Sequence, residues 1–268
     1  MRIGLISGDS YRHKYYCNTI LDNYDVSLLV NTKRSLNIAD EVKISYLNEN
    51  DKKLLEDHTN LRIIKEKEYF LPKGESFNCK NLEVRLEVDQ KSLNSNQVIE
   101  AAKKANLDMV LVFGTSLIKK DLLKVLPKYT INLSGLSPYY KGAATLLWPF
   151  YFMEPQYAGH TFHIVDLRID HGDIIHQGRP EIFVDDTLPD IGARDVIRAT
   201  EELPLLLKKI ESGDIKLYPQ NSKGKIFYQN DFKPYHLRVI RFLLDNGFLG
   251  EYLQNKHLFP DPEVINQV

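Results

Sequence analysis

Two segments of the chain place polar side chains directly after apolar, strand-like runs. The first is INLSGLSPYYKGAA, residues 131–144, in which Asn132 and Ser134 lie at the end of such a run. The second is GHTFHIVDLRIDHGDII, residues 159–175, in which Asp170 lies in a polar loop between two apolar runs. An Asn amide at the end of a buried strand can donate a hydrogen bond to an oxyanion, and a carboxylate can accept a proton from an attacking nucleophile. Together the segments indicate acid–base chemistry beside a stabilised negative charge.

The elements that position these residues follow an α/β pattern. Apolar runs rich in β-branched residues alternate with longer amphipathic stretches, which is typical of βαβ units. A helix is expected from Ser95 or Asn96, and a longer one from about Ile191 to Ile210. The expected strands are Arg2–Ser7, Val26–Val30, Leu61–Lys65, Leu82–Val88, Met109–Phe113, Thr130–Leu133, Thr161–Val165 and Ile174–Ile182. The predicted fold is therefore Rossmann-like, a mostly parallel sheet with flanking helices, followed by a small C-terminal subdomain.

The domain boundary is expected where the long helix ends, at Gly213, because glycine is the commonest residue just past a helix end. Residues 1–213 form the predicted main domain. Residues 214–268 form the predicted accessory subdomain, with a GKIFYQNDF stretch and an apolar, helix-like HLRVIRFLLDNGFL segment.

Charge and cysteine content exclude several classes of function. With 35 Lys plus Arg against 36 Asp plus Glu, the net charge of −1 gives no general attraction for nucleic acid. No apolar run is long enough to predict a membrane span. Cys17 and Cys79 lie far apart and form no CxxC pair, so neither a disulfide framework nor a metal site is predicted. A cytoplasmic location is the default expectation.

The two polar segments resemble the signature of the formyltransferase family that uses 10-formyltetrahydrofolate. In that family a strand ends in Asn-x-His before a Pro-aromatic-basic-Gly turn, and a later strand leads into an Asp-x-Gly-x-Asp-x-Gly-like loop. Residues that match are Asn132, Pro138, Tyr140, Lys141, Gly142, Thr161, His163, Asp166, Asp170, Gly172 and Asp173. Gly114, in VFGTSLIKKDLLKVLP, matches the glycine that closes a strand beside the folate site. The resemblance spans roughly residues 80–212.

This resemblance implies an enzyme with 10-formyltetrahydrofolate as donor and no metal. The implied catalytic residues are Asn132, Asp170 and Ser134, the last by its position. The implied donor-binding residues are Phe113, Gly114, Thr115, Val165, Asp166 and Gly172. The predicted substrate-binding residues are Arg12, His13, Lys14, Tyr139, Tyr140 and Lys141; the first three follow a strand where an α/β sheet opens toward a ligand crevice.

The chain departs from the family at Ser134, which stands where the family has histidine. The segment from Asn132 to Pro138 is also one residue shorter than in the family, and no histidine occurs between His58 and His160. A serine hydroxyl can donate a hydrogen bond but cannot carry a positive charge near neutral pH. The usual catalytic set is therefore incomplete in its own loop.

Other histidines and plainer roles stay open as alternatives. His163 lies on an alternating strand, which is more typical of a structural histidine than of a site residue, and His171 is expected to point away from Asp170. Asn132 can bond its own turn, Asp170 can cap the next element, and both tyrosines of the Pro-aromatic turn can serve in packing. The basic residues after the first strand can form a solvated helix start.

The acceptor follows from comparing three groups that the chain resembles. Methionyl-tRNA enzymes add a C-terminal barrel larger than the segment after Gly213, and glycinamide ribonucleotide enzymes carry a Gly- and Ser-rich phosphate loop that SGDSYRHKYY does not match. The predicted function is formyl transfer to the amine of a nucleotide-linked amino sugar, with reduced folate and that sugar as partners, no nucleic acid or membrane partner, and a homodimer left open. The alternatives are a catalytically impaired binding protein, or another acyl transfer or hydrolysis on this scaffold.

Overall fold

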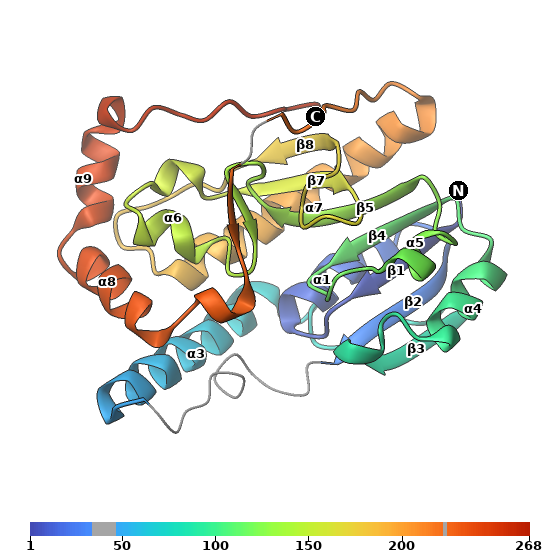
Figure 1. Ribbon diagram of the computed structural model, residues 1–268, viewed down its shortest axis with the longest axis horizontal. Helices are drawn as coiled ribbons and strands as arrows, with labels where there is room; N and C mark the ends of the chain where they lie inside the picture. Colours follow the sequence, from blue (N-terminus) through green and yellow to red (C-terminus); the bar gives the residue numbers. More distant parts are fainter. Residues whose placement is uncertain (34–46, 222–223) are drawn as a thin grey trace.

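The computed structural model describes residues 1–33, 47–221 and 224–268. Its centre is a seven-stranded sheet in the order β3-β2-β1-β4-β5-β7-β8 (Figure 1). The strands are β1 (Ile3–Ser7), β2 (Val26–Lys33), β3 (Val84–Asp89), β4 (Met109–Phe113), β5 (Tyr129–Gly135), β7 (His160–Ile164) and β8 (Ile174–Gly178). Neighbours from β3 to β5 pair in parallel, whereas β7 and β8 are added antiparallel. The predicted mostly parallel α/β fold is confirmed.

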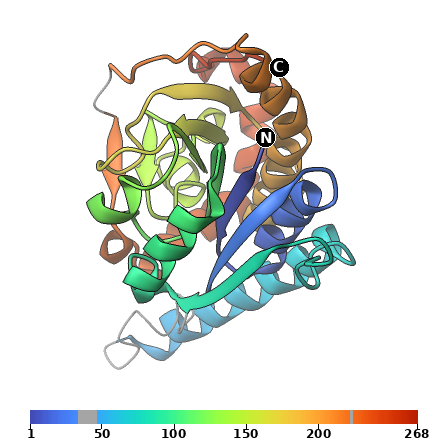
Figure 2. The same ribbon diagram turned by 90° about the vertical axis from the view of Figure 1, so that its right-hand side faces the viewer.

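Helices cover both faces of this sheet (Figures 1 and 2). They are α1 (Tyr11–Leu21), α3 (Glu49–Phe70), α4 (Asn96–Ala105), α5 (Lys120–Leu123) and α7 (Leu188–Ser212), with short 3-10 turns at Gln90–Ser92, Pro155–Tyr157, Gln229–Asp231 and Lys256–Leu258. Successive side chains of a strand point to opposite faces. Leu5 accordingly packs in the core that includes α1 and α7, and Ile6 in the core that includes α4 and α5. Both faces are thus buried, as a parallel sheet requires.

The strand expected at Leu61–Lys65 is wrong, because these residues lie inside α3. The helix is capped by Asn48, whose side chain accepts a hydrogen bond from Asp51 N at 2.9 Å. Its buried residues are spaced along one side, whereas Ile64 is 59% exposed. A short apolar run cannot distinguish a strand from part of a helix, and here the cap and the length of the polar surroundings decide for the helix.

The two predicted helices are confirmed with small shifts of their ends. α4 starts at Asn96 after Ser95 as its N-cap residue. α7 starts at Leu188, where Thr187 and Asp190 form a capping box, and ends before Gly213, which has φ 75°. These local signals are strong because each satisfies backbone groups that a helix end leaves unpaired.

Residues after Gly213 pack along the main sheet rather than apart from it. β9 (Lys225–Phe227) pairs in parallel with β6 (Tyr140–Gly142). α8 (Pro234–Asp245) contacts α3 and α6 (Leu147–Tyr151), and α9 (Phe248–Gln254) follows it (Figure 1). Near the end of the chain, Gln177 N of β8 donates to Ile265 O at 2.7 Å. The division at Gly213 stays a prediction.

Candidate active site

Asn132 lies in the middle of β5, between Val112 of β4 and His163 of β7. Because Asn132 and His163 are register partners on antiparallel strands, their side chains leave the same face of the sheet. Asn132 Nδ2 lies 3.2 Å from His163 Nε2 and 3.2 Å from Asp170 Oδ1. His163 Nε2 and Asp170 Oδ1 are 3.3 Å apart. We call this group of three side chains the central triad.

Asp170 is fixed on the loop between β7 and β8 by bonds to distant parts of the chain. Its backbone is left-handed, with φ 44°. Gly142 N donates to Asp170 Oδ2 at 2.8 Å, and Gln220 Nε2 donates to the carbonyl oxygens of Asp170 at 3.0 Å and Gly172 at 2.8 Å. Burial alone would raise the pKa of the Asp170 carboxyl, but the adjacent His163 ring, the Gly142 N–H and the Lys141 charge outweigh burial and lower that pKa. The triad therefore holds a carboxylate at neutral pH.

The His163 ring commits one nitrogen to the backbone and turns the other toward the triad. Nδ1 lies 2.9 Å from Ile164 O, and because a carbonyl oxygen only accepts, Nδ1 carries a proton. Nε2 can then accept from Asn132 when the ring is neutral, or donate to Asp170 when it is protonated. The structure thus brings the His163 ring to Asn132 and Asp170, and a role in the chemistry stays a prediction. This contact depends on the antiparallel register that pairs His163 with Asn132, and a single sequence does not reveal that register.

Ser134, two residues after Asn132 on β5, makes only a local contact. Its Oγ donates to Gly135 O at 3.3 Å. Across the described ranges, no hydrogen bond joins Ser134 to Asn132, His163 or Asp170. Position 134 therefore adjoins the triad through the strand but brings no ionisable group into it.

The predicted donor-binding residues lie on both sides of β5. Phe113 is the register partner of Leu133, and Gly114 and Thr115 follow it at the end of β4. On the other side, Val165 N donates to Thr130 O at 2.8 Å. The two segments thus border the strand that carries Asn132.

The loop after Val165 is stiffened by its own contacts. Asp166 accepts from the Arg168 side chain at 2.9 Å and 2.6 Å, and the His171 ring lies 3.3 Å from Arg168 Nη1. A Cβ atom at Gly172 would meet Ile164 O at 1.8 Å, so only glycine fits there. Donor binding by these residues stays a prediction.

His13 packs against the turn that carries Gly114. A Cβ at Gly114, where φ is 70°, would lie 2.0 Å from His13 Nε2. Ser10 Oγ lies 2.8 Å from His13 Nδ1, and the His13 ring stands edge-on to Phe113 with centroids 4.7 Å apart. The buried His13 ring therefore joins the turn after β1 to the turn after β4.

The other predicted substrate-binding residues also have partners within the chain. Arg12 forms an ion pair with Glu66 of α3, and Lys14 Nζ donates to Glu75 O at 3.3 Å. These contacts fix the turn after β1, and a role in substrate binding stays a prediction for both residues.

The two tyrosines of the aromatic turn serve in packing. Tyr139 donates its hydroxyl hydrogen to Glu263 O at 2.8 Å. The Tyr140 ring is buried and stacks on Phe227 of β9 at 7° and 6.0 Å. Packing accounts for both rings, and contact with a substrate stays a prediction.

One group of described residues brings potential metal ligands together: His160, His176 and Glu202 hold ligand atoms within 4.8 Å of one another. Gln267 N donates to His176 Nδ1 at 3.0 Å, so the ring proton is on Nε2, which lies 3.1 Å from Glu202 Oε2 and cannot at the same time bind a metal. His160 bridges Asp195 at 2.8 Å and Glu202 at 2.9 Å. The group is a hydrogen-bonded ion network beneath the sheet.

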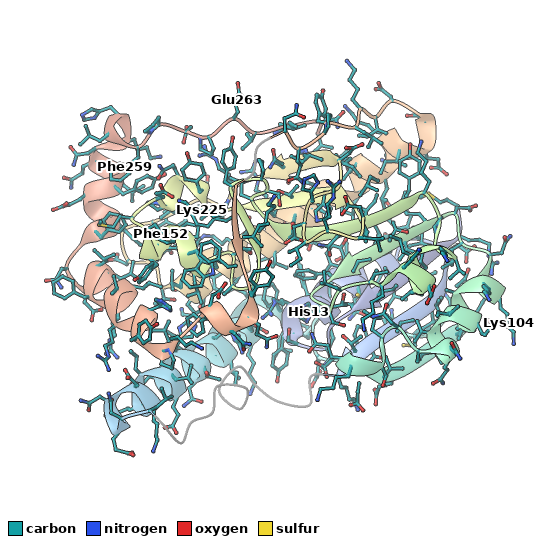
Figure 3. All side chains as sticks on the ribbon, in the orientation of Figure 1. His13, Lys104, Phe152, Lys225, Phe259 and Glu263 are labelled. Carbon is teal, nitrogen blue, oxygen red and sulfur yellow. The ribbon has the colours of Figure 1, made fainter. Side chains whose placement is uncertain are left out.

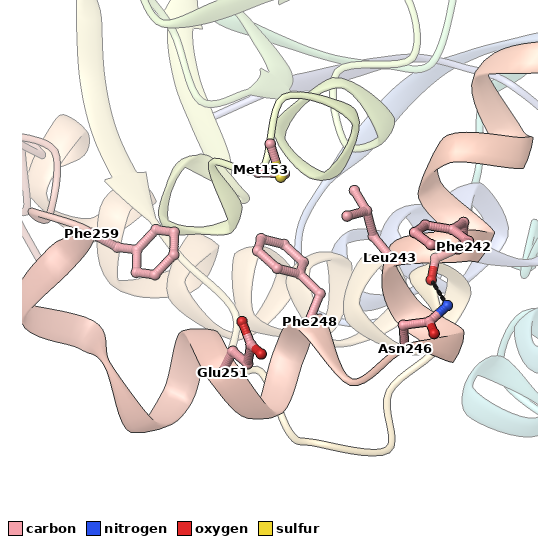
Figure 4. A pocket seen from close by; sticks show the side chains of 7 residues that line it. All are labelled: Met153, Phe242, Leu243, Asn246, Phe248, Glu251 and Phe259. Carbon is pink, nitrogen blue, oxygen red and sulfur yellow. Dashed lines mark hydrogen bonds between the residues drawn. The ribbon is translucent and has the colours of Figure 1, made fainter.

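A separate apolar cavity of about 450 Å³ lies among the C-terminal helices (Figure 4). It is lined by Met153, Phe242, Leu243, Asn246, Phe248, Glu251 and Phe259. Apart from Asn246 and Glu251 it offers no polar side chain, and it contains no member of the central triad. This cavity is therefore separate from the triad. No helix in the described part of the chain is both long and apolar enough to cross a membrane.

Comparison with known proteins supplies the family. The sequence pattern described as formyl transferase matches residues 39–206. The chain is 36% identical over 142 residues to the methionyl-tRNA formyltransferase of Clostridium botulinum, covering 50% of this chain and 43% of that protein. It is 29% identical over 123 residues to the GDP-perosamine N-formyltransferase of Brucella melitensis, covering 45% and 47%. The chain thus spans about half the length of the relatives it matches.

Among solved structures, the fold is similar to that of an N-formyltransferase from Helicobacter canadensis in complex with folinic acid and dTDP-3-aminofucose. The TM-score is 0.53 at 16% identity, and the match covers 92% of this chain and 82% of that one. At this identity the likeness concerns the fold alone.

Proposed function

Because the chain belongs to the formyl transferase family, we propose that it moves a formyl group from 10-formyltetrahydrofolate to the amine of a nucleotide-linked amino sugar. The observation that carries this proposal is the central triad, in which an amide, an imidazole and a carboxylate meet within 3.3 Å of one another. These are the groups that acyl transfer to an amine needs: an oxyanion donor, a proton acceptor and a fixed negative charge.

The reaction joins the acceptor nitrogen to the formyl carbon and breaks the bond from that carbon to N10 of the folate. In the tetrahedral intermediate, negative charge collects on the former carbonyl oxygen, and Asn132 is the donor placed to bind it. The amine proton passes to His163 Nε2, and from there to N10 as the folate leaves. Asp170 stays ionised and stabilises the imidazolium that forms between these two transfers.

Protonation of His163 also changes the partners of Asn132. With a neutral ring, one Asn132 amide hydrogen faces His163 Nε2 and the other faces Asp170. Once Nε2 carries a proton it can no longer accept from Asn132, and it donates to Asp170 instead. One amide hydrogen is then released toward the oxyanion at the moment the charge develops. In this account His163 supplies the imidazole that Ser134 does not.

The finer choice of substrates rests on the relatives. The Helicobacter canadensis protein is in complex with folinic acid and a nucleotide-linked amino sugar. Its match covers 92% of this chain and therefore includes part of the segment after Gly213. The Brucella melitensis relative is named for GDP-perosamine. These likenesses support a reduced folate as donor and an amino sugar as acceptor.

A second acceptor, methionyl-tRNA, is favoured by one observation, the 36% identity to the Clostridium botulinum enzyme. Against it, the chain has a net charge of −1 and so no overall attraction for a polyanion. The two acceptors therefore have to be compared directly.

Two measurements test the proposal. Titration calorimetry with 5-formyltetrahydrofolate tests the donor, and we expect saturable heat; none at millimolar ligand would remove the enzyme hypothesis. Mass spectrometry after incubation with 10-formyltetrahydrofolate tests the acceptor, with amino sugars linked to dTDP, GDP or UDP in one series and methionyl-tRNA in another. A formylated sugar supports the proposal, formylated tRNA supports the second acceptor, and folate binding without any product supports a binding protein.

A further inference from the structure

Lys141 is a buried lysine beside the central triad. It lies on β6 between Tyr140, which packs into an aromatic cluster, and Gly142, whose N–H binds Asp170. Because successive side chains of a strand alternate, Lys141 leaves β6 on the face opposite Tyr140. Only 1% of its surface is exposed.

The Lys141 ammonium lies near the Asp170 carboxylate but does not bond to it. Within residues 1–33, 47–221 and 224–268, no hydrogen bond and no ion pair reaches its Nζ atom. A charged ammonium is costly to bury, and buried lysines are almost always paired. Burial lowers the pKa of Lys141, and the Asp170 carboxylate opposes part of that effect. The side chain is thus buried, while its charged end lies near the Asp170 carboxylate without bonding to it.

The charges around Lys141 lead to the reaction centre. Its main charge partner is Asp170, followed more weakly by Arg168 and Asp166 of the same loop. Asp166 is already bound by Arg168, and Asp170 already accepts from Gly142 and Asn132, with His163 Nε2 3.3 Å from its Oδ1. Neither carboxylate therefore needs Lys141 to satisfy its oxygens, and the ammonium is left for an anion that the described residues do not provide.

We infer that Lys141 is a further catalytic residue, whose ammonium faces the oxyanion that forms on the formyl carbon. This inference rests on the proposed function and deepens it. Lys141 keeps its proton throughout, so it forms and breaks no bond. It supplies the fixed positive charge that the family's histidine would bring and that Ser134 cannot, while His163 moves the proton.

The test removes this charge at nearly constant side-chain length. Lys141→Met is expected to lower kcat by about a hundredfold or more, as for loss of an oxyanion partner, with folate binding by calorimetry close to wild type. The matched control is Lys225→Met, which removes an ammonium from the paired strand, where Lys225 contacts Glu154 at 2.7 Å and lies over Phe152 (Figure 3). The control is expected to keep wild-type turnover. A Lys141→Met enzyme within about threefold of wild type would overturn the inference.

A second variant separates charge from packing. Lys141→Ala is expected to regain at least about tenfold in turnover when ethylammonium is added, and nothing with tetramethylammonium at the same ionic strength, because only the former is a hydrogen-bond donor that fits the vacated space. A folded Lys141→Ala enzyme that ethylammonium does not rescue contradicts the inference. If the wild-type protein forms no product, both the proposed function and the inference fail. If the wild-type protein is active and Lys141→Met is equally active, only the inference fails.

Discussion

Asn132 and His163 face each other across two antiparallel strands, with Asn132 Nδ2 3.2 Å from His163 Nε2. Both side chains also reach the same oxygen of Asp170. The contact places an imidazole beside Asn132 and Asp170 although residue 134 is a serine. The ring comes from the neighbouring strand instead of from two residues further along the same strand.

Asn132 and Asp170 are expected to act as one unit. Asn132→Ala and Asp170→Ala should each lower turnover by roughly a hundredfold or more, because each removes a group that acts in the transition state. The double variant should lose less than the product of the two single losses, since the side chains share a hydrogen bond. Steady-state kinetics on the three variants, with thermal melting to check folding, measures this. Near-normal turnover in either single variant would remove that residue from the mechanism.

Ser134 is expected to matter little. Ser134→Ala should cost no more than about 0.5–1.5 kcal/mol of transition-state stabilisation, the worth of one neutral hydrogen bond, because its Oγ bonds only to Gly135 O. Ser134→His should not raise turnover, since His163 already occupies the position of the imidazole. A silent wild type together with an active Ser134→His variant would show instead that the catalytic set has decayed.

The ion network beneath the sheet predicts a pH dependence of stability. Burial opposes the charge on His160, but Asp195 and Glu202 outweigh burial and raise the pKa of His160 to about 9. In the unfolded chain the ring titrates near pH 6.5. The stabilisation is therefore complete below about pH 6.5 and is lost as the pH rises through about 9.

This dependence can be read from one variant. The difference in free energy of unfolding between wild type and His160→Gln should shrink by roughly 2 kcal/mol between about pH 7 and about pH 9. Urea unfolding at the two pH values measures both proteins. A difference that stays constant or grows with pH would contradict the assignment of a charged His160.

Much of the fold could be predicted because its signals are local. The strand at Met109–Phe113 is an uninterrupted apolar run, and Gly213 ends α7 as a left-handed cap. The strand predicted at Leu61–Lys65 was wrong because a short apolar run fits a strand and part of a helix equally well. The longer helix that contains this run is capped at Asn48.

The candidate site could be predicted only in part. Asn132 and Asp170 stood out through their motifs, and the structure brings them together. His163 matched the same motif, but its contact with Asn132 and Asp170 depends on the register between β5 and β7, which alternation within one strand cannot reveal. The sequence likewise could not show that Lys141 Nζ makes no hydrogen bond to the described residues, because its neighbours are set by the tertiary structure.

The most direct test of this account is the turnover of His163→Asn. Asparagine can still donate to Ile164 O, as His163 Nδ1 does, but it has no ring nitrogen that can take up and release a proton. His171→Asn is the matched control, because His171 sits on the same loop as Asp170 and lies against Arg168. Proton transfer through His163 predicts that His163→Asn lowers kcat by about a hundredfold or more, with 5-formyltetrahydrofolate binding unchanged and the control near wild type. Turnover of His163→Asn within a few-fold of an active wild type would contradict it.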